Sequence, residues 1–235
     1  VESKLDFVGK VLETKATHKK TGKTDIITVD VFSYDHAGRM TKQTNKINNQ
    51  TAETIVENTY DKLGQLENKK VGAGLQKVDY AYNVRGWLKN INQDSDGNDN
   101  DLFNFTLKYN DASDVNKRLF NGNIAQTNWN SLSVNTGSTV SNQYTYSYDA
   151  LNRIIGAVDN TGHYNISGIT YDKNGNIETL TRNGYQGTAN FTNMDKLVYN
   201  YDSGNKLNKV ADNGNKTHGF KAVSYTHLTL PTNGE

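Results

Sequence analysis

Apolar and polar residues alternate in short runs along most of this chain, which is the pattern of half-buried β-strands. In the clearest run, Tyr144, Tyr146 and Tyr148 stand at every second position, so their side chains share one face of an extended strand. The nearest candidate for a helix, Ala52–Val56, is too short and too rich in β-branched residues. We therefore predict an all-β fold. The predicted strands are Lys10–Thr17, Ile26–Tyr34, Met40–Ile47, Thr54–Tyr60, Leu66–Val71, Gln76–Tyr82, Trp87–Ile91, Leu102–Tyr109, Gly122–Trp129, Gln143–Tyr148, Arg153–Val158, Ile166–Tyr171, Ile177–Arg182, Lys196–Tyr201 and Leu207–Val210.

A seven-residue motif joins successive strands and occurs in eight copies. In Tyr34–Met40, a Tyr ends a strand, an Asp follows it, and a Gly and an apolar residue stand four and six places after the Tyr. This order reads as strand, tight turn, strand, so the copies predict tandem antiparallel β-hairpins in one curved, twisted sheet. Their unequal spacing favours hairpins of different lengths over identical coils. The copies begin at Leu5, Tyr34, Tyr60, Tyr82, Arg118, Tyr148, Tyr171 and Tyr201, and the Arg118 copy keeps only its second half.

The turn of this motif has a conformational requirement. Gly or Asn fills the fourth place in every copy, and these residues adopt positive φ most readily. A type I turn closed by a left-handed residue needs such a residue there. The Asp or Asn after the Tyr can accept hydrogen bonds from backbone amides two residues on. The expected turn residues are Gly9, Gly38, Gly64, Gly86, Gly122, Asn152, Gly175 and Asn205. The Tyr and Asp (or Asn) residues of the complete copies are Tyr34, Asp35, Tyr60, Asp61, Tyr82, Asn83, Tyr148, Asp149, Tyr171, Asp172, Tyr201 and Asp202.

The Tyr-Asp-x-x-Gly-Arg-Leu pattern resembles the YD repeat of RHS-repeat proteins. The resemblance covers about residues 5–221, and Tyr82–Leu88 and Asn121–Ile124 look like variants found in bacterial members. It implies a strip of β-hairpins that spirals into a large hollow shell, of which this chain would be an open segment. In relatives the shell encloses a C-terminal toxic polypeptide, or serves cell-surface adhesion and signalling, as in teneurins. The Asp-Pro self-cleavage motif of bacterial shells is absent from this sequence, so neither cleavage nor a toxin domain is assigned.

The resemblance also implies a function and partners. It implies a non-catalytic structural region of a secreted or cell-surface protein, with the rest of the same polypeptide shell and its enclosed C-terminal domain as partners. An alternative is a carbohydrate-binding adhesion module, in which exposed rings such as Tyr146 and Trp87 stack on cell-surface glycans. The other interpretation of these rings, and of Trp129, is packing against neighbouring hairpins, because strand faces must cover one another.

Composition narrows the chemistry. The net charge is +1 and the charges are interspersed, so nothing favours a nucleic-acid or anionic-membrane partner. Cysteine is absent, and no apolar run is long enough for a membrane-spanning helix. We find no nucleophile, metalloprotease or phosphate-loop motif, and the histidines are scattered, so we expect neither an enzyme nor a cofactor. Tyr outnumbers Phe, 14 to 7, which suits strands that bury a ring and place its hydroxyl on a polar partner.

The expected organisation is a hairpin array over residues 1–222 with an irregular insertion at about 92–142. The chain opens in mid-pattern at Val1, so we expect it to be a fragment. Residues 223–235 lack the repeat, contain the only proline and resemble a translated sequencing adapter, so they are left out of the expected fold. The acidic loop offers oxygen ligands that suit calcium, but its Gly97 does not match an EF-hand, so a solvated loop is favoured. The candidate ligands are Asp94, Asp96, Asn98, Asp99 and Asp101.

Overall fold

The computed structural model describes residues 1–92, 101–133, 137–221 and 223–224. In this part of the chain all regular structure is β-strand except two short 3₁₀ turns, η1 (Gly72–Gly74) and η2 (Val115–Lys117). The all-β prediction is confirmed, and the helix candidate Ala52–Val56 lies mostly in a strand. No helix among the described residues is long and apolar enough to cross a membrane.

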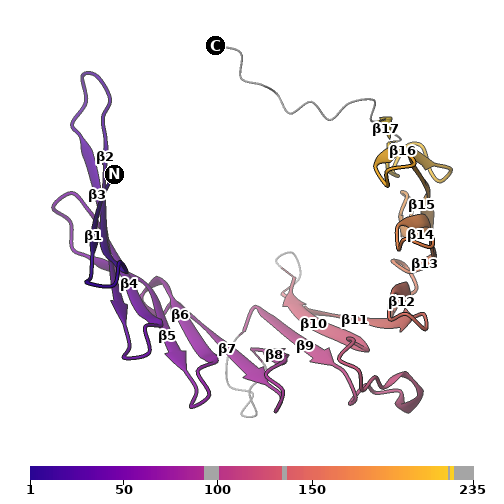
Figure 1. Ribbon diagram of the computed structural model, residues 1–235, viewed down its shortest axis with the longest axis horizontal. Coiled ribbons are helices and arrows are strands. Elements are labelled where there is room, and N and C mark those ends of the chain that lie inside the picture. The colour runs from indigo at the N-terminus through magenta and orange to yellow at the C-terminus, as the bar shows by residue number, and fades with distance from the viewer. Residues whose placement is uncertain (93–100, 134–136, 222, 225–235) are drawn as a thin grey trace. The chain divides into compact units, whose positions relative to one another are not determined.

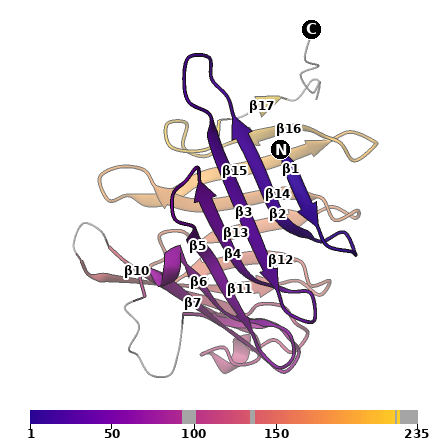
Figure 2. The same cartoon turned by 90° about the vertical axis from the view of Figure 1, so that its left-hand side faces the viewer.

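Chain contacts divide the molecule into two units, Val1–Thr106 and Leu107–Glu235, with the boundary inside one strand, β9. In the first unit each strand pairs antiparallel with the next one in the chain, so the unit is a run of hairpins side by side (Figures 1 and 2). Its strands are β1 (Glu2–Leu5), β2 (Val11–His18), β3 (Ile26–Tyr34), β4 (Met40–Ile47), β5 (Glu53–Tyr60), β6 (Leu66–Val71), β7 (Gln76–Tyr82), β8 (Leu88–Ile91) and the start of β9 (Phe103–Lys108).

The second unit has the same organisation. Its strands also pair antiparallel in chain order, and the pairing of β12 with β13 is the sparsest, with Ala157 opposite Ile166 as the one registered position. Its strands are β10 (Gln126–Leu132), β11 (Thr139–Tyr148), β12 (Ile154–Asp159), β13 (Ile166–Tyr171), β14 (Ile177–Tyr185), β15 (Phe191–Tyr201), β16 (Leu207–Asp212) and β17 (Val223–Ser224).

Strand bounds differ most from the prediction at β10 and β11, and at β14 and β15, which extend the predicted strands to Tyr185 and back to Phe191. β10 begins at Gln126 and not at Gly122, because Gly122 lies in the turn of the Arg118 copy and the pairing with β11 starts at Gln126, opposite Thr145. β11 begins at Thr139, earlier than expected, since its polar start pairs with β10 up to Leu132. The short strand β1 was not predicted, and β17 falls in the segment that was left out of the expected fold.

The buried core of both units is small. The buried apolar residues are few, and three of them are alanines. A hairpin strip of this kind cannot depend on a large hydrophobic core, so its stability depends on contacts between neighbouring hairpins. The buried apolar residues are Val56, Leu107, Tyr109, Ala112, Ala125, Ala157, Ile169 and Val210.

Candidate functional site

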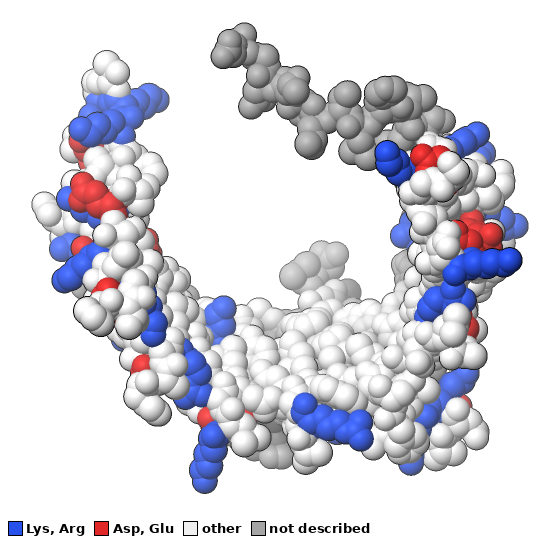
Figure 3. Space-filling model, viewed as in Figure 1, with Lys and Arg blue, Asp and Glu red and all other residues white. Residues whose placement is uncertain are grey.

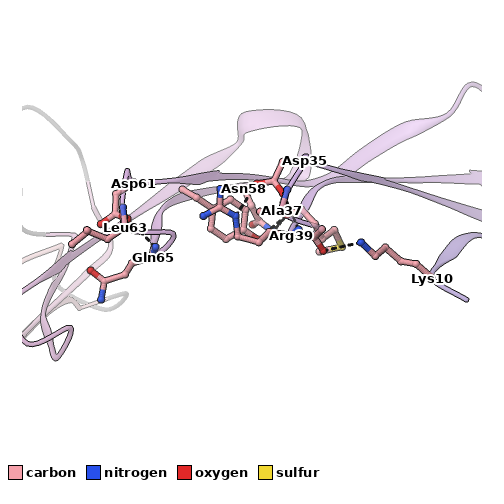
Figure 4. A network of polar contacts seen from close by, with 11 residues as sticks. Lys10, Asp35, Ala37, Arg39, Asn58, Asp61, Leu63 and Gln65 are labelled. Carbon is pink, nitrogen blue, oxygen red and sulfur yellow. Dashed lines mark hydrogen bonds and ion pairs between the residues drawn. The ribbon is translucent and has the colours of Figure 1, made fainter. Parts of the chain in front are cut away.

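The candidate site is the row of Tyr-Asp turns, and the turn at Asp35 shows its geometry (Figure 4). Tyr34 pairs with Met40 across a five-residue loop. The carboxylate oxygen Oδ1 of Asp35 accepts hydrogen bonds from the amides of Ala37 and Arg39, both at 2.9 Å. The backbone closes the loop as well, because the Asp35 amide donates to the Arg39 carbonyl and the Gly38 amide donates to the Asp35 carbonyl. One side chain therefore satisfies two loop amides.

The same bonds recur in the other complete turns. Asp61 accepts from the amides of Leu63 and Gln65 at 2.9 and 2.8 Å. Asn83 does the same with its amide oxygen at 2.9 and 3.0 Å, so the turn needs an oxygen acceptor and not a charge. The remaining turns with this pair of bonds are those of Asp6, Asp149, Asp172 and Asp202.

The fourth place has a left-handed backbone in all eight copies, with φ between 61° and 99°. Two of these residues, Asn152 and Asn205, carry a side chain, and asparagine tolerates this conformation better than other non-glycine residues. The eight residues are Gly9 (87°), Gly38 (81°), Gly64 (86°), Gly86 (78°), Gly122 (99°), Asn152 (62°), Gly175 (90°) and Asn205 (61°).

Hydrogen bonding lowers the pKa of four turn carboxylates, those of Asp35, Asp149, Asp172 and Asp202. The Arg39 backbone amide and, more weakly, its guanidinium, whose Nε donates to Asp35 at 2.7 Å, lower the pKa of Asp35. The pKa of Asp149 is lowered in the same way by Arg153. In the next turn the pKa of Asp172 is lowered chiefly by a neutral donor, the side-chain amide of Asn176.

The motif tyrosines join each hairpin to the one before it. Each hydroxyl donates to the backbone carbonyl of the apolar residue in the sixth place of the preceding copy. Sequence reasoning missed this bond, and the available signal was that the complete copies always use Tyr and never Phe. The six bonds are Tyr34 to Val11 (2.7 Å), Tyr60 to Met40 (2.8 Å), Tyr82 to Leu66 (3.1 Å), Tyr148 to Ile124 (2.8 Å), Tyr171 to Ile154 (2.6 Å) and Tyr201 to Ile177 (3.0 Å).

Basic side chains add a second contact between hairpins. The fifth-place residue of one copy lies over the Tyr ring of the next, an arrangement that favours cation–π attraction. Figure 4 labels two of these residues, Lys10 and Arg39, beside the turns that they reach. The observed contacts are Lys10 over Tyr34 (4.7 Å to the ring centroid), Arg39 over Tyr60 (4.5 Å) and Arg153 over Tyr171 (4.4 Å).

Asparagines close the other ends of several hairpins, a role that sequence reasoning did not assign. The side-chain oxygen of Asn48 accepts from the amide of Ile27 at 2.8 Å, in the first strand of the same hairpin. Asn92 accepts from Asp79 at 2.9 Å in the same manner. Asn is a turn residue because its side chain satisfies backbone groups that the strand ladder leaves open.

The aromatic residues considered for sugar binding make contacts within the molecule. Trp129 stacks on Tyr144 with ring centroids 5.7 Å apart, and the hydroxyl of Tyr146 lies 3.0 Å from the hydroxyl of Thr127. The guanidinium carbon of Arg85 lies over the Trp87 ring, 5.1 Å from the ring centroid. Burial raises the pKa of Tyr144. The contacts of Trp129, Tyr144 and Tyr146 join β10 to β11 and agree with packing between hairpins, whereas the Arg85 contact of Trp87 lies within its own turn.

No metal centre emerges from the described part of the chain. In it, no group of three His, Asp or Glu side chains could hold a metal ion. Of the calcium candidates, Asp94, Asp96, Asn98 and Asp99 lie outside the described residues, and Asp101 lies inside them. On the face drawn in Figure 3, acidic and basic side chains are interspersed among a larger area of uncharged residues.

Comparison with known proteins gives a fold. No protein-family model matches the chain, and no curated protein matches it. The crystal structure of TcdB2-TccC3 without its hypervariable C-terminal region is similar over 93% of this chain and 14% of that chain, with 15% identity and a TM-score of 0.54. The crystal structure of TcdB2-TccC3-Cdc42 is similar over 88% and 14%, also with 15% identity and a TM-score of 0.54. At this identity the likeness concerns the fold alone, and the chain spans a small part of these structures.

Proposed function

We propose that this chain is a non-catalytic structural region of a hollow RHS-type shell, which encloses or presents a C-terminal effector in a secreted or cell-surface protein. The observation that carries the proposal is the series of six tyrosine-to-carbonyl bonds, each of which joins one Tyr-Asp hairpin to the preceding one. The fold likeness to TcdB2-TccC3 supports it.

The recurring contacts of the hairpin strip fit a wall better than a catalytic scaffold. The repeated side chains bond to backbone groups and to one another, so their hydrogen bonds and ring contacts serve to join hairpins. A wall must cover a large area with few residues, and a strip of hairpins joined edge to edge does so without a second layer. The partners in this proposal are the rest of the same polypeptide and the C-terminal domain that it surrounds.

No specific contact of the aromatic rings supports the alternative function, glycan binding. The rings of Trp129, Tyr144 and Tyr146 contact one another or a neighbouring strand. A ring that stacks on a neighbouring ring leaves less of its face for a sugar. On a glycan array we expect no binding that depends on Tyr146 or Trp87, and a signal lost in both Tyr146→Ala and Trp87→Ala would favour the adhesion module instead.

Protease protection tests the proposal in the complete gene product. The polypeptide that follows the hairpin region should resist limited proteolysis in the wild-type protein. A variant with Phe at the six motif tyrosines should lose this protection, because the hairpins separate more readily, while the matched control Tyr185→Phe should keep it. Rapid cleavage of the downstream polypeptide in all three proteins, the wild type included, would exclude the enclosing shell.

A further inference from the structure

Neighbouring turns meet through two different kinds of contact, and the fourth place distinguishes them. In the first kind the fourth place is Gly, and the space where its Cβ would stand is taken by the long fifth-place side chain of the preceding copy. A Cβ would lie 2.5 Å from Lys10 Nζ at Gly38, 2.7 Å from Arg39 Nη1 at Gly64, and 3.0 Å from Gln65 Nε2 at Gly86.

In the second kind the fourth place is Asn, and its side chain makes the contact. The Oδ1 of Asn152 accepts from the side-chain amides of Asn121 at 2.6 Å and Asn123 at 3.3 Å. These two residues flank the turn glycine of the preceding copy, which therefore reads Asn-Gly-Asn. The next such junction repeats the arrangement, with Asn205 accepting from Asn174 at 2.9 Å and from Asn176 at 3.1 Å.

The two kinds of contact do not mix at the six junctions joined by a tyrosine bond. Where the fifth place is Lys, Arg or Gln, the next copy has Gly in its fourth place, and where it belongs to Asn-Gly-Asn, the next copy has Asn. At Gly175 the preceding Arg153 leaves the Cβ space open but still reaches the turn, since its Nη1 donates to the Asp172 carbonyl at 3.5 Å.

We propose that the fourth place of each turn selects the fifth place of its neighbour, so that these residues decide which hairpins can lie side by side. The partner that each turn fits is another turn of matching type. This inference concerns the order of the hairpins, and it stands whether or not the shell encloses an effector.

A mismatch is unfavourable in either direction. An Asn in place of Gly38 or Gly64 would place its Cβ against the end of the neighbouring Lys10 or Arg39 side chain, which would have to move away from the tyrosine ring. A Gly next to Asn-Gly-Asn would remove the acceptor that two side-chain amides share. In a chain with eight similar hairpins, the hairpins can pair in the wrong order. Matched fourth- and fifth-place residues disfavour these wrong pairings.

A substitution with a matched control tests the selection in the full chain. Gly64→Asn should raise the equilibrium constant for unfolding of the first unit about two- to fivefold, the effect of losing one exposed cation–π contact between Arg39 and Tyr60. Gly9→Asn makes the same change at nearly the same φ, 87° against 86°, but with nothing within 4 Å of the new Cβ, and it should have a much smaller effect. Equal effects of the two substitutions on the denaturant midpoint would overturn the proposal.

A double-mutant cycle gives an independent test in the second unit. Asn123→Arg and Asn152→Gly should each destabilise the protein when made alone. Made together they convert the junction to the other type, so the double variant should unfold at a higher denaturant concentration than either single variant. If the two changes in the free energy of unfolding simply add, or if the double variant is the least stable of the three, the fourth and fifth places do not select each other. The inference is then wrong.

Discussion

At the scale of single residues, the constant feature of this protein is a backbone conformation. The fourth place of the motif is left-handed in every copy, whereas the first place varies from Tyr to Leu5 and Arg118. The Asp after the Tyr contributes an oxygen acceptor, and Asn83 performs the same task. Hydrogen-bond geometry therefore defines the turn more strictly than side-chain charge does.

The first prediction compares two residues of one turn. Gly64→Val should cost about 2–3 kcal/mol of the free energy of unfolding, because a β-branched residue is strained at positive φ and its Cβ would displace Arg39. Tyr60→Phe should cost about 0.5–1.5 kcal/mol, the net value of one hydrogen bond. The Met40 carbonyl then keeps its other donor, the side-chain amide of Asn58. Denaturant titration of both variants measures the difference, and equal unfolding would contradict this description of the motif.

The second prediction concerns the residue after the Tyr. Asp35→Asn should leave stability near neutral pH almost unchanged, apart from the weakened contact with the Arg39 side chain, because an amide oxygen can accept the same two backbone bonds. Asp35→Ala removes the acceptor from two loop amides and should lower the melting temperature clearly more than Asp35→Asn does. Thermal unfolding of the two variants beside the wild type distinguishes the role of the acceptor from that of the charge.

At the scale of elements, the strands could be predicted where a motif and an alternating run coincide. The bounds of β3, β4, β6, β7 and β13 follow directly from the sequence pattern. The strand Gly122–Trp129 was predicted with the wrong bounds for β10, and the start of β11 was missed, because the polar residues there are strand only through pairing with each other. The tyrosine-to-carbonyl bonds were missed because the use of Tyr and never Phe in the complete copies indicates a bonded hydroxyl but does not identify its acceptor, a backbone carbonyl in another hairpin.

The third prediction tests these bonds where neighbouring hairpins are least joined. β12 and β13 share one registered position, so the bond from Tyr171 to the Ile154 carbonyl carries an unusual share of their contact. Tyr171→Phe should therefore accelerate amide hydrogen exchange in β12 and β13 several-fold, in line with a loss of about 1 kcal/mol. Tyr185→Phe is the control, since the Tyr185 ring is 52% exposed and its hydroxyl has no hydrogen bond within the described residues. Similar exchange in the two variants would show that the Tyr171 bond does not hold the strands together.

At the scale of the whole molecule, many small polar contacts replace a large core. Within each unit the buried apolar residues are few, while bonded turns recur along the chain. Repeats of this kind add stability junction by junction, so one weakened turn should be tolerated and a change made in every turn should not. The sequence shows the number of hairpins and their turns; the contacts that join them become visible only in three dimensions.

The last prediction weakens four of the turns at once by lowering the pH. Hydrogen bonds lower the pKa of Asp35, Asp149, Asp172 and Asp202 below the ordinary value of 3.8. A carboxylate whose folded-state pKa is lowered contributes stability above its unfolded pKa and loses it as the pH falls through the folded value. The denaturant midpoint should therefore change little between about pH 7 and 5 and fall below about pH 4.

A fourfold Asp-to-Asn variant isolates the share of the turns in this acid sensitivity. It keeps acceptors for the turn amides, as Asn83 does, but removes the titrating groups. Its midpoint should therefore fall less between about pH 4 and 2 than that of the wild type. If both proteins lose stability equally over this range, the acid response arises from other carboxylates. The buried Asp159 is the first to examine, because its pKa is lowered, despite the opposing effect of burial, by hydrogen bonds that include one from the Thr161 hydroxyl at 2.6 Å.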